Sequence, residues 1–173
     1  MKSQNELVTV GMPVYNGEQF LKQAVASILS QNYSDIELII ADDCSTDNSV
    51  NIYEEFAKKD TRIRIFKHKK NIGQIANFNF VLKQAKGIYF MWAAQDDFRD
   101  TKALEKLLNL HKQYPDAALA VSNYKNVYNE TAYFVYPEFP YNNNANRTNS
   151  LISFLKTDNL SFFYGLHKTA ILK

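Results

Sequence analysis

The chain is poor in the residues that usually build disulfides and metal clusters. Cys44 is the only cysteine, so neither an intrachain disulfide nor a cysteine-based zinc site can form. The three histidines, His68, His111 and His167, are scattered along 173 residues and give no support to a histidine metal site. The longest apolar run, residues 88–94, is far shorter than the roughly 20 residues that cross a bilayer. The first residues also lack the apolar segment of a signal peptide.

The chain also lacks a strong charge of either sign. Its formal net charge of +2 gives no basis for a nucleic-acid partner, and the short basic cluster at residues 67–70 is typical of a solvated strand end. A single cysteine suits a reducing compartment. We therefore expect a cytoplasmic protein, either soluble or associated peripherally with the inner face of the membrane.

Apolar strands alternate with amphipathic helices along most of the chain. Strands are predicted at residues 7–14, 37–41, 62–67, 88–94 and 117–122, and helices at 18–31, 52–57, 75–85 and 104–111. This order predicts an α/β protein, in which helices cover both faces of a mostly parallel sheet in a three-layer α/β/α arrangement. Beyond it we expect a long polar loop at 133–150, a short helix at 151–156 and a weak strand at 161–165.

Polar residues follow three of the predicted strands at their carboxyl ends. These are Pro13 to Asn16, the pair Asp42 and Asp43, and the pair Asp96 and Asp97. Parallel strands bring such ends to one edge of a sheet, where α/β proteins bind their ligands. Four carboxylates at one edge repel each other unless a divalent cation or the donor N–H groups of a ligand compensate, and Mg²⁺ or Mn²⁺ suits oxygen ligands. The alternative is that each Asp only caps the following helix or stabilises a turn.

Three segments together resemble family 2 glycosyltransferases, which have the GT-A (nucleotide-diphospho-sugar transferase) fold. They are VTVGMPVYNGEQFLKQAVASILSQ, DIELIIADDCSTDNSV and NIGQIANFNFVLKQAKGIYFMWAAQDD, and they cover residues 8–97. The resemblance implies an inverting transferase that moves a sugar from a nucleotide-diphosphate donor, expected to be a UDP-sugar, to a glycan or lipid-linked acceptor. It also implies Mn²⁺ or Mg²⁺ as cofactor and a role in bacterial cell-envelope polysaccharide synthesis.

The resemblance also implies roles for individual residues. Tyr15 would contact the nucleotide base, Asp43 would accept a hydrogen bond from the base, and Asp42 would hold the loop. Asp96 would bind the metal ion directly, and Asp97 would assist it or contact the ribose and the sugar. The implied nucleotide-sugar site comprises Pro13, Val14, Tyr15, Glu18, Asp42, Asp43, Asn71, Gly73, Asp96 and Asp97. For Glu18, a place at a helix N-terminus is an equally good explanation.

The chain departs from the family pattern at two positions. Ala94 stands where the Asp-x-Asp metal motif usually has its leading Asp, which is expected to weaken nucleotide or metal binding. Phe78 stands where an Arg often precedes a conserved Asn, so a positive contact to the donor is lost. That Asn corresponds to Asn79, which we expect to tie loops together rather than to touch the sugar.

The catalytic base is not assigned within this chain. In the family it lies in the acceptor half, after the region that matches residues 163–168, and no carboxylate follows Asp158 here. We expect residues 1–125 to form the nucleotide-sugar-binding core and residues 126–173 to be a partial acceptor-side segment of the same domain. The base is then expected beyond Lys173, in a chain that looks truncated.

Two other functions are weighed against transfer. The first is a nucleotide-sugar-binding fragment without transfer activity, because the region of the base is absent. The second is a dinucleotide-binding oxidoreductase. It is disfavoured because Pro-Val-Tyr-Asn-Gly, rather than Gly-x-Gly-x-x-Gly, follows the first strand.

Overall fold

The structure is a computed structural model that describes residues 6–122, 125–128, 132–135 and 163–173. The strands are β1 (Val8–Val14), β2 (Ile36–Asp42), β3 (Ile63–Lys67), β4 (Tyr89–Trp92), β5 (Leu119–Ala120), β6 (Lys125–Tyr128), β7 (Ala132–Val135) and β8 (Leu166–Lys168). The helices are α1 (Leu21–Leu29), α2 (Ser49–Ala57), α3 (Gln74–Gln84), α4 (Ala103–Gln113) and α6 (Thr169–Leu172). No helix in the described part of the chain is long and apolar enough to cross a membrane.

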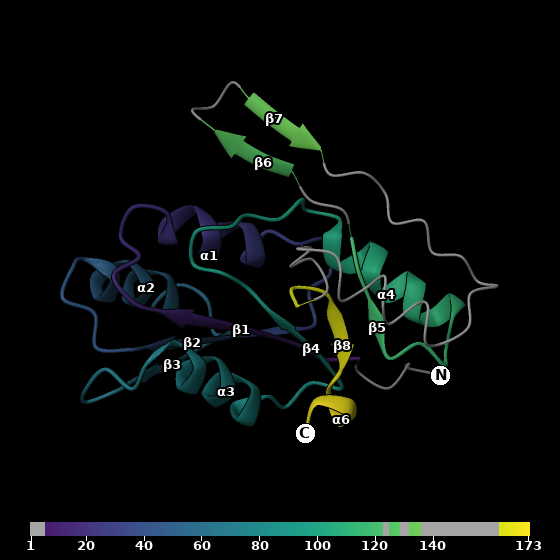
Figure 1. Ribbon diagram of the computed structural model, residues 1–173, viewed down its shortest axis with the longest axis horizontal. Coiled ribbons are helices and arrows are strands. Elements are labelled where there is room, and N and C mark those ends of the chain that lie inside the picture. Colours follow the sequence, from purple (N-terminus) through teal and green to yellow (C-terminus); the bar gives the residue numbers. More distant parts are fainter. Residues whose placement is uncertain (1–5, 123–124, 129–131, 136–162) are drawn as a thin grey trace.

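The central sheet has the strand order β3-β2-β1-β4-β8-β5 (Figure 1). β1 pairs in parallel with β2 and β4, and β2 pairs in parallel with β3, whereas β8 lies antiparallel between β4 and β5. β6 and β7 form a separate antiparallel pair. The mostly parallel sheet predicted from the sequence is confirmed, and the carboxyl ends of β1, β2 and β4 lie side by side.

Helices cover both faces of this sheet, as predicted (Figure 1). Helix α1 turns Leu21, Ala24, Val25 and Ile28 inward at helical spacing, and they share one apolar cluster with residues of α2 and α4. Helix α3 packs Val81 against the opposite face in a second cluster. The sheet is therefore the middle of three layers, and its strands are apolar on both sides because both sides are covered.

Two predicted strands extend two residues past the carboxyl ends of the observed ones. The strand predicted at 88–94 ends at Trp92, although Ala93 still donates its N–H to Gly11 O at 2.9 Å. The neighbouring position on β1 is Pro13, which has no N–H to continue the hydrogen bonding. The strand predicted at 117–122 is reduced to Leu119–Ala120. The acidic pair Asp96 and Asp97 consequently stands on a loop rather than directly at a strand end.

The last part of the chain differs more from the prediction. Residues 163–165 form a turn, and the strand expected at 161–165 is found instead at Leu166–Lys168. Residues 133–135 belong to β7 and not to the long loop that was predicted from residue 133. The remainder of that loop, the helix predicted at 151–156 and residues 161–162 lie outside the described residues.

The buried Glu37 of β2 links this strand to three other segments. It lies at the amino end of the strand, away from the end that carries Asp42. Glu37 Oε1 accepts hydrogen bonds from Thr9 Oγ1 at 2.6 Å and from Lys86 N at 2.7 Å. Its other oxygen, Oε2, accepts from Arg64 Nη1 at 2.8 Å. Burial alone would raise the pKa of Glu37, but these hydrogen bonds outweigh it and hold the pKa below its usual value. This network joins β1, β2, β3 and the segment before β4.

Candidate functional site

The loop after β1 is tied to the loop after β2 by side-chain and backbone hydrogen bonds. Asn16 donates its N–H to Ser45 Oγ at 3.0 Å, and its Oδ1 accepts from Thr46 N at 2.8 Å. Gly17 donates its N–H to Ser49 Oγ at 2.8 Å. Asn16 has a φ of 50°, a left-handed conformation that Asn tolerates better than most residues. The short polar residues of this sequence thus fix the two loops against each other.

Glu18 belongs to the same set of contacts. Its Oε2 accepts the N–H of Asn48, the residue preceding α2, at 2.8 Å, and its own N–H donates to Asp47 Oδ2 at 2.9 Å. Asp47 Oδ1 also accepts Ser49 N at 3.0 Å. Burial would raise the pKa of Asp47, but these hydrogen bonds lower it overall. Glu18 thus lies before the observed start of α1, and its carboxylate caps the beginning of α2 rather than of its own predicted helix. Its contact with a ligand stays a prediction.

The two carboxylates after β2 are both buried and both hold backbone. Asp42 Oδ2 accepts Ser45 N at 3.1 Å, which agrees with the expected loop-holding role. Asp43 is only 2% exposed, and its two oxygens accept Ile72 N at 2.7 Å and Gly73 N at 3.0 Å. Asp43 thus fixes the turn that precedes α3.

That turn has its own local hydrogen bond. Asn71 Oδ1 accepts Gly73 N at 3.0 Å, and Gly73 has a φ of 89° in the left-handed region. Glycine enters this conformation at low cost, and a Cβ there would be strained. The predicted turn residues Asn71 and Gly73 are therefore brought against Asp43. Strand β1 separates this place from the loop that carries Asp96 and Asp97.

The end of β1 lies between both acidic loops. Asp43 donates its N–H to Val14 O at 2.8 Å, on the β2 side. On the β4 side, Tyr15 N donates to Gln95 Oε1 at 2.9 Å, and Gln95 Nε2 donates to Tyr15 O at 3.0 Å. The side chains of Pro13 and Val14 are buried, whereas Tyr15 is 48% exposed. Of these three expected base-pocket residues, only Tyr15 presents an accessible side chain to a ligand.

Asp96 and Asp97 are exposed at the surface of the loop after β4. Asp96 helps to line a hollow of 220 Å³, whose lining residues are Asn16, Gly17, Gln19, Phe20, Gln95 and Asp96. The surroundings of Asp97 desolvate its carboxylate and so raise its pKa. The negative charge of Asp96 raises that pKa further, and the charge of Arg99 partly opposes the rise. The two carboxylates therefore repel each other at this edge, which is a setting that favours a cation.

Arg99 joins this loop to the turn before β8. Its Nη2 donates to Trp92 O at 3.2 Å and to Tyr164 O at 3.1 Å. Burial of the guanidinium lowers the pKa of Arg99, and the charge of Asp97 works against that change. Arg99 was not singled out from the sequence. Its contact with residue 164 spans 65 positions, so no local pattern could have indicated it.

The residues present fit a divalent ion that is coordinated mainly by the phosphate oxygens of a bound nucleotide. No group of three or more His, Cys, Asp and Glu residues that could hold a metal ion occurs within the described ranges. Mg²⁺ binds in many phosphate sites through one or two carboxylates together with phosphate oxygens and water. Asp96 and Asp97 supply such a pair, and their mutual repulsion is what a cation relieves.

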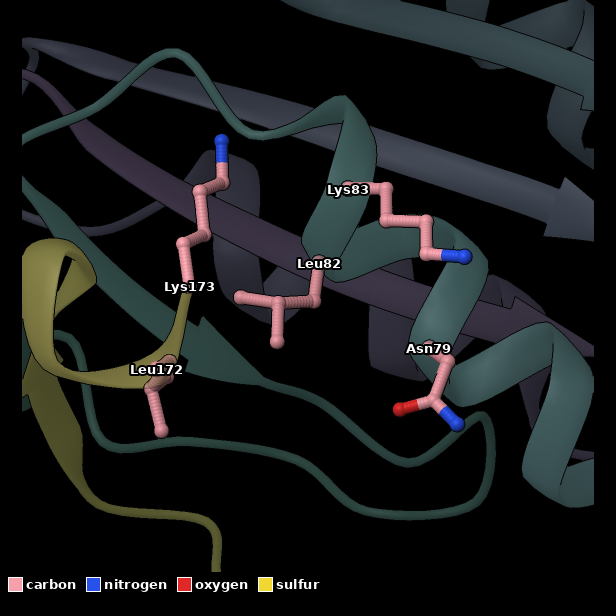
Figure 2. A pocket seen from close by; sticks show the side chains of 5 residues that line it. All are labelled: Asn79, Leu82, Lys83, Leu172 and Lys173. Atoms are coloured by element: carbon pink, nitrogen blue, oxygen red, sulfur yellow. The ribbon is translucent and has the colours of Figure 1, made fainter.

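A second hollow, of 340 Å³, lies away from these loops, between α3 and the last residues of the chain (Figure 2). Its lining residues are Asn79, Leu82, Lys83, Leu172 and Lys173. Lys173 Nζ donates to Ala85 O at 2.8 Å. The hollow carries two lysines and no acidic residue, so it offers no metal site.

Asn77, and not Asn79, makes the buried tying contacts of α3, which join this helix to β2 and to the residue after β3. Asn77 is buried, its Nδ2 donates to Ala41 O at 2.8 Å, and its Oδ1 lies 3.1 Å from His68 Nε2. Asn79 is exposed on α3 beside the second hollow (Figure 2). The expectation for Asn79 was therefore wrong, and Asn77, two positions earlier, has the role instead. The distinction depends on which side of α3 faces the sheet.

This correction predicts different costs for two matched substitutions. Asn77→Leu leaves the carbonyl of Ala41 without its buried donor, so we expect a loss of about 1–3 kcal/mol in the free energy of unfolding. Asn79→Leu on the exposed side is expected to change it by less than about 0.5 kcal/mol. Urea denaturation of both variants measures the difference. Equal costs would contradict the tie through Asn77.

Comparisons of the sequence show which known proteins this chain resembles. The family model described as "Glycosyl transferase family 2" matches residues 9–170. The chain is 42% identical over 107 residues to an uncharacterised glycosyltransferase of Haemophilus influenzae. It is 35% identical over 108 residues to the putative teichuronic acid biosynthesis glycosyltransferase TuaG of Bacillus subtilis. Each alignment covers 62% of this chain and 43% of the relative, so the chain spans less than half the length of these curated relatives.

Two solved structures share the fold. S. aureus TarS 1-349 in complex with UDP-GlcNAc superposes with a TM-score of 0.76 at 20% identity, covering 95% of this chain and 46% of that chain. The mannosyltransferase PcManGT from Pyrobaculum calidifontis, in complex with GDP-Man and Mn²⁺, gives a TM-score of 0.56 at 20% identity, covering 60% and 32%. This likeness confirms the expected GT-A type of α/β fold.

Proposed function

The chain belongs to glycosyl transferase family 2, and on that premise we propose that it binds a nucleotide-diphosphate sugar, expected to be a UDP-sugar, and serves inverting sugar transfer. One observation carries the proposal. At a single edge of the sheet, the end of β1 and its loop are hydrogen-bonded to both neighbouring loops. Asn16 and Asp43 make the bonds on the side of β2, and Gln95 makes them on the side of β4. This edge carries an accessible aromatic ring at one point and two exposed carboxylates at another.

The aromatic part of this edge suits the base of the nucleotide. The exposed ring of Tyr15 offers a flat apolar surface for stacking, which is a contact worth roughly 1–3 kcal/mol for a base. Asp43 accepts two backbone N–H groups in the structure. A carboxylate has about four lone-pair sites, so a base N–H is a further partner that its chemistry allows. In this proposal Pro13, Val14, Asn71 and Gly73 shape the wall of the base site through their backbone.

The acidic part of this edge suits the diphosphate. Asp96 is proposed to bind Mn²⁺ or Mg²⁺ directly, with Asp97 assisting. When bound, such an ion neutralises charge that develops on the departing nucleoside diphosphate. PcManGT was solved with Mn²⁺, which is a precedent within the same fold. Ala94 removes a third acid from this loop, so the ion depends on the ligand's phosphates more than on the protein.

The acceptor side is proposed from the family and from the order of the chain. We assign residues 1–125 to the donor-binding core and residues 126–173 to an acceptor-side segment of the same domain. An acceptor hydroxyl would attack the anomeric carbon from the face opposite the diphosphate, which inverts that carbon. A general base has to take the hydroxyl proton, and we assign no described residue to this role.

The acceptor is proposed to be a growing glycan or a lipid-linked glycan of the bacterial cell envelope. TuaG, a relative, carries a name that refers to teichuronic acid biosynthesis. A lipid-linked acceptor would require a cytoplasmic enzyme to work at the inner face of the membrane. The comparisons do not favour the alternative of a donor-binding fragment without transfer.

Turnover of nucleotide sugars tests the proposal. The chain is incubated with UDP-GlcNAc, UDP-glucose or GDP-mannose, Mn²⁺ and a panel of glycan acceptors, and release of the nucleoside diphosphate is followed. We expect release from a UDP-sugar that requires Mn²⁺ and increases with the correct acceptor. UDP binding without release under any acceptor would favour the fragment alternative. Binding of NADH in place of UDP would favour an oxidoreductase.

A further inference from the structure

The structure assigns to Gln95 a positioning role that couples the base-contacting loop to the metal-binding loop. Gln95 directly precedes Asp96 in the chain, and its side chain reaches back to Tyr15, 80 positions earlier. The inference rests on the proposed function, because it explains how the two halves of the donor site keep their relative position. Nothing in the sequence pattern indicated this residue.

The carboxamide of Gln95 gives the Tyr15 backbone the hydrogen bonds that a longer β4 strand would have given it. β1 and β4 pair in parallel as far as Gly11 and Trp92, and one further bond joins Ala93 N to Gly11 O. Pro13 has no N–H and cannot donate to the next position of β4. Two residues later, Tyr15 again turns its N–H and C=O toward the β4 side. There Gln95 satisfies both groups, as a donor at 3.0 Å and as an acceptor at 2.9 Å.

Gly17 supplies an independent observation. A Cβ atom placed on Gly17 would lie 2.6 Å from Gln95 Oε1 and 2.7 Å from Gln95 Cδ, which is too close for any real contact. Gly17 does not have a positive φ, so its backbone conformation does not itself require glycine. A side chain at this position would displace the end of the Gln95 side chain, so glycine leaves the carboxamide its place beside the loop. Both loops are therefore shaped around this one side chain.

The consequence for binding follows from the connectivity. Asp96 is attached to Gln95 by one peptide bond, and Tyr15 is held by the Gln95 side chain. A nucleotide diphosphate that touches Tyr15 at its base and Asp96 through a metal ion therefore meets two loops whose spacing is already set. Without the carboxamide, binding would have to order the two loops, and the entropy of that ordering would weaken the affinity.

Substitutions of Gln95 test this role. Gln95→Met keeps the length of the side chain but removes both strong hydrogen bonds, and Gln95→Glu keeps an acceptor for Tyr15 N while losing the donor to Tyr15 O. Gln23→Met, on the exposed side of α1, is the matched control. We expect Gln95→Met to weaken UDP binding in Mn²⁺ about tenfold and Gln23→Met to leave it unchanged. Gln95→Glu is expected to weaken it at least as much as Gln95→Met, because a carboxylate oxygen would then face Tyr15 O, another acceptor. The thermal unfolding midpoints of all three are expected to stay close to that of the unchanged chain.

Two further measurements separate positioning from a general structural effect. Hydrogen exchange of the Tyr15 amide is expected to become about tenfold faster in Gln95→Met, because that amide loses its acceptor. In the Tyr15→Ala background, Gln95→Met is expected to cost clearly less than tenfold, because the residue that it positions is gone.

Unchanged exchange at Tyr15, unchanged UDP affinity or full additivity with Tyr15→Ala would each overturn the positioning role. An unsubstituted chain that binds no UDP at all would instead overturn the proposed function. The positioning role of Gln95 would then be overturned as well, because it rests on that function. The binding of the unsubstituted chain is therefore measured first.

Discussion

Asp96→Ala is expected to weaken UDP binding about 30- to 100-fold when Mn²⁺ is present. The loss corresponds to about 2–3 kcal/mol, which is within the range for removing one carboxylate from a cation at effective dielectric constants near 20. Asp96→Asn keeps an oxygen ligand without the charge, so we expect an intermediate loss. Isothermal titration calorimetry with UDP in Mn²⁺ measures all three affinities.

The sign of the effect should change when the metal is removed. In EDTA, the Asp96 carboxylate repels the diphosphate directly, so Asp96→Ala is expected to bind UDP as well as or slightly better than the unchanged chain. Asp116→Ala, at an exposed aspartate outside the loops, is the control in both buffers. An equal loss with and without Mn²⁺ would mean that Asp96 contacts the nucleotide without an ion, which would contradict its assignment as a metal ligand.

Glu37→Leu is expected to cost about 3–5 kcal/mol in the free energy of unfolding. The substitution leaves the buried Thr9 hydroxyl and the Lys86 N–H without their shared acceptor. It also removes the ion pair with the partly exposed Arg64 guanidinium, which keeps its hydrogen bond to Gln84 O. Glu55→Leu, at an exposed position on α2, is expected to change stability by less than about 0.5 kcal/mol. Urea denaturation at neutral pH measures both.

The same network gives the chain a defined response to acid. The pKa of Glu37 is lower in the folded chain than in the unfolded one. The folded state therefore holds the charged form more strongly, and this stabilisation is complete above the unfolded pKa of about 4.3. It is lost as the pH falls through the folded pKa. We expect the unchanged chain to lose stability over that range more steeply than Glu37→Leu. Parallel pH profiles would contradict the network.

The early strands could be predicted from the sequence because their signal is local. β1 and β2 are mostly apolar and buried along their whole length, since both of their faces are covered by helices. The end of β4 was placed too late, because the residues that follow Trp92 are also apolar. What ends the strand is Pro13 on the neighbouring strand, and that information lies far away in the chain.

The strand near the C-terminus could not be placed in the same way. β8 is only three residues long, Leu166–Lys168, and it exists because β4 and β5 lie on either side of it. Its local pattern favours a strand no more than the preceding residues do. A Cβ on Gly165 would lie 2.7 Å from Ala120 O, so the glycine directly before β8 allows the chain to pass close to β5.

The candidate site was predictable in its residue types and less so in its contacts. The acidic loops were found because each follows an apolar strand. The hydrogen bonds that organise them link side chains to backbone over long separations, from Asp43 to residues 72 and 73 and from Gln95 to Tyr15. Asn77 was missed for the same reason, because it lies on α3 and its partner Ala41 lies on β2, 36 positions earlier. Such contacts appear only when the strands have been placed side by side.

The most direct test of the central claim is to locate the nucleotide on the protein by NMR. The amide spectrum of the ¹⁵N-labelled chain is recorded with UDP and Mg²⁺, and then with small amounts of Mn²⁺, which broadens the signals nearest to the ion. We predict shifts at residues 14–18, 42–43 and 71–73, and the strongest broadening at residues 95–97. Shifts and broadening confined to the hollow between α3 and the last residues of the chain (Figure 2), or absent altogether, would contradict the account.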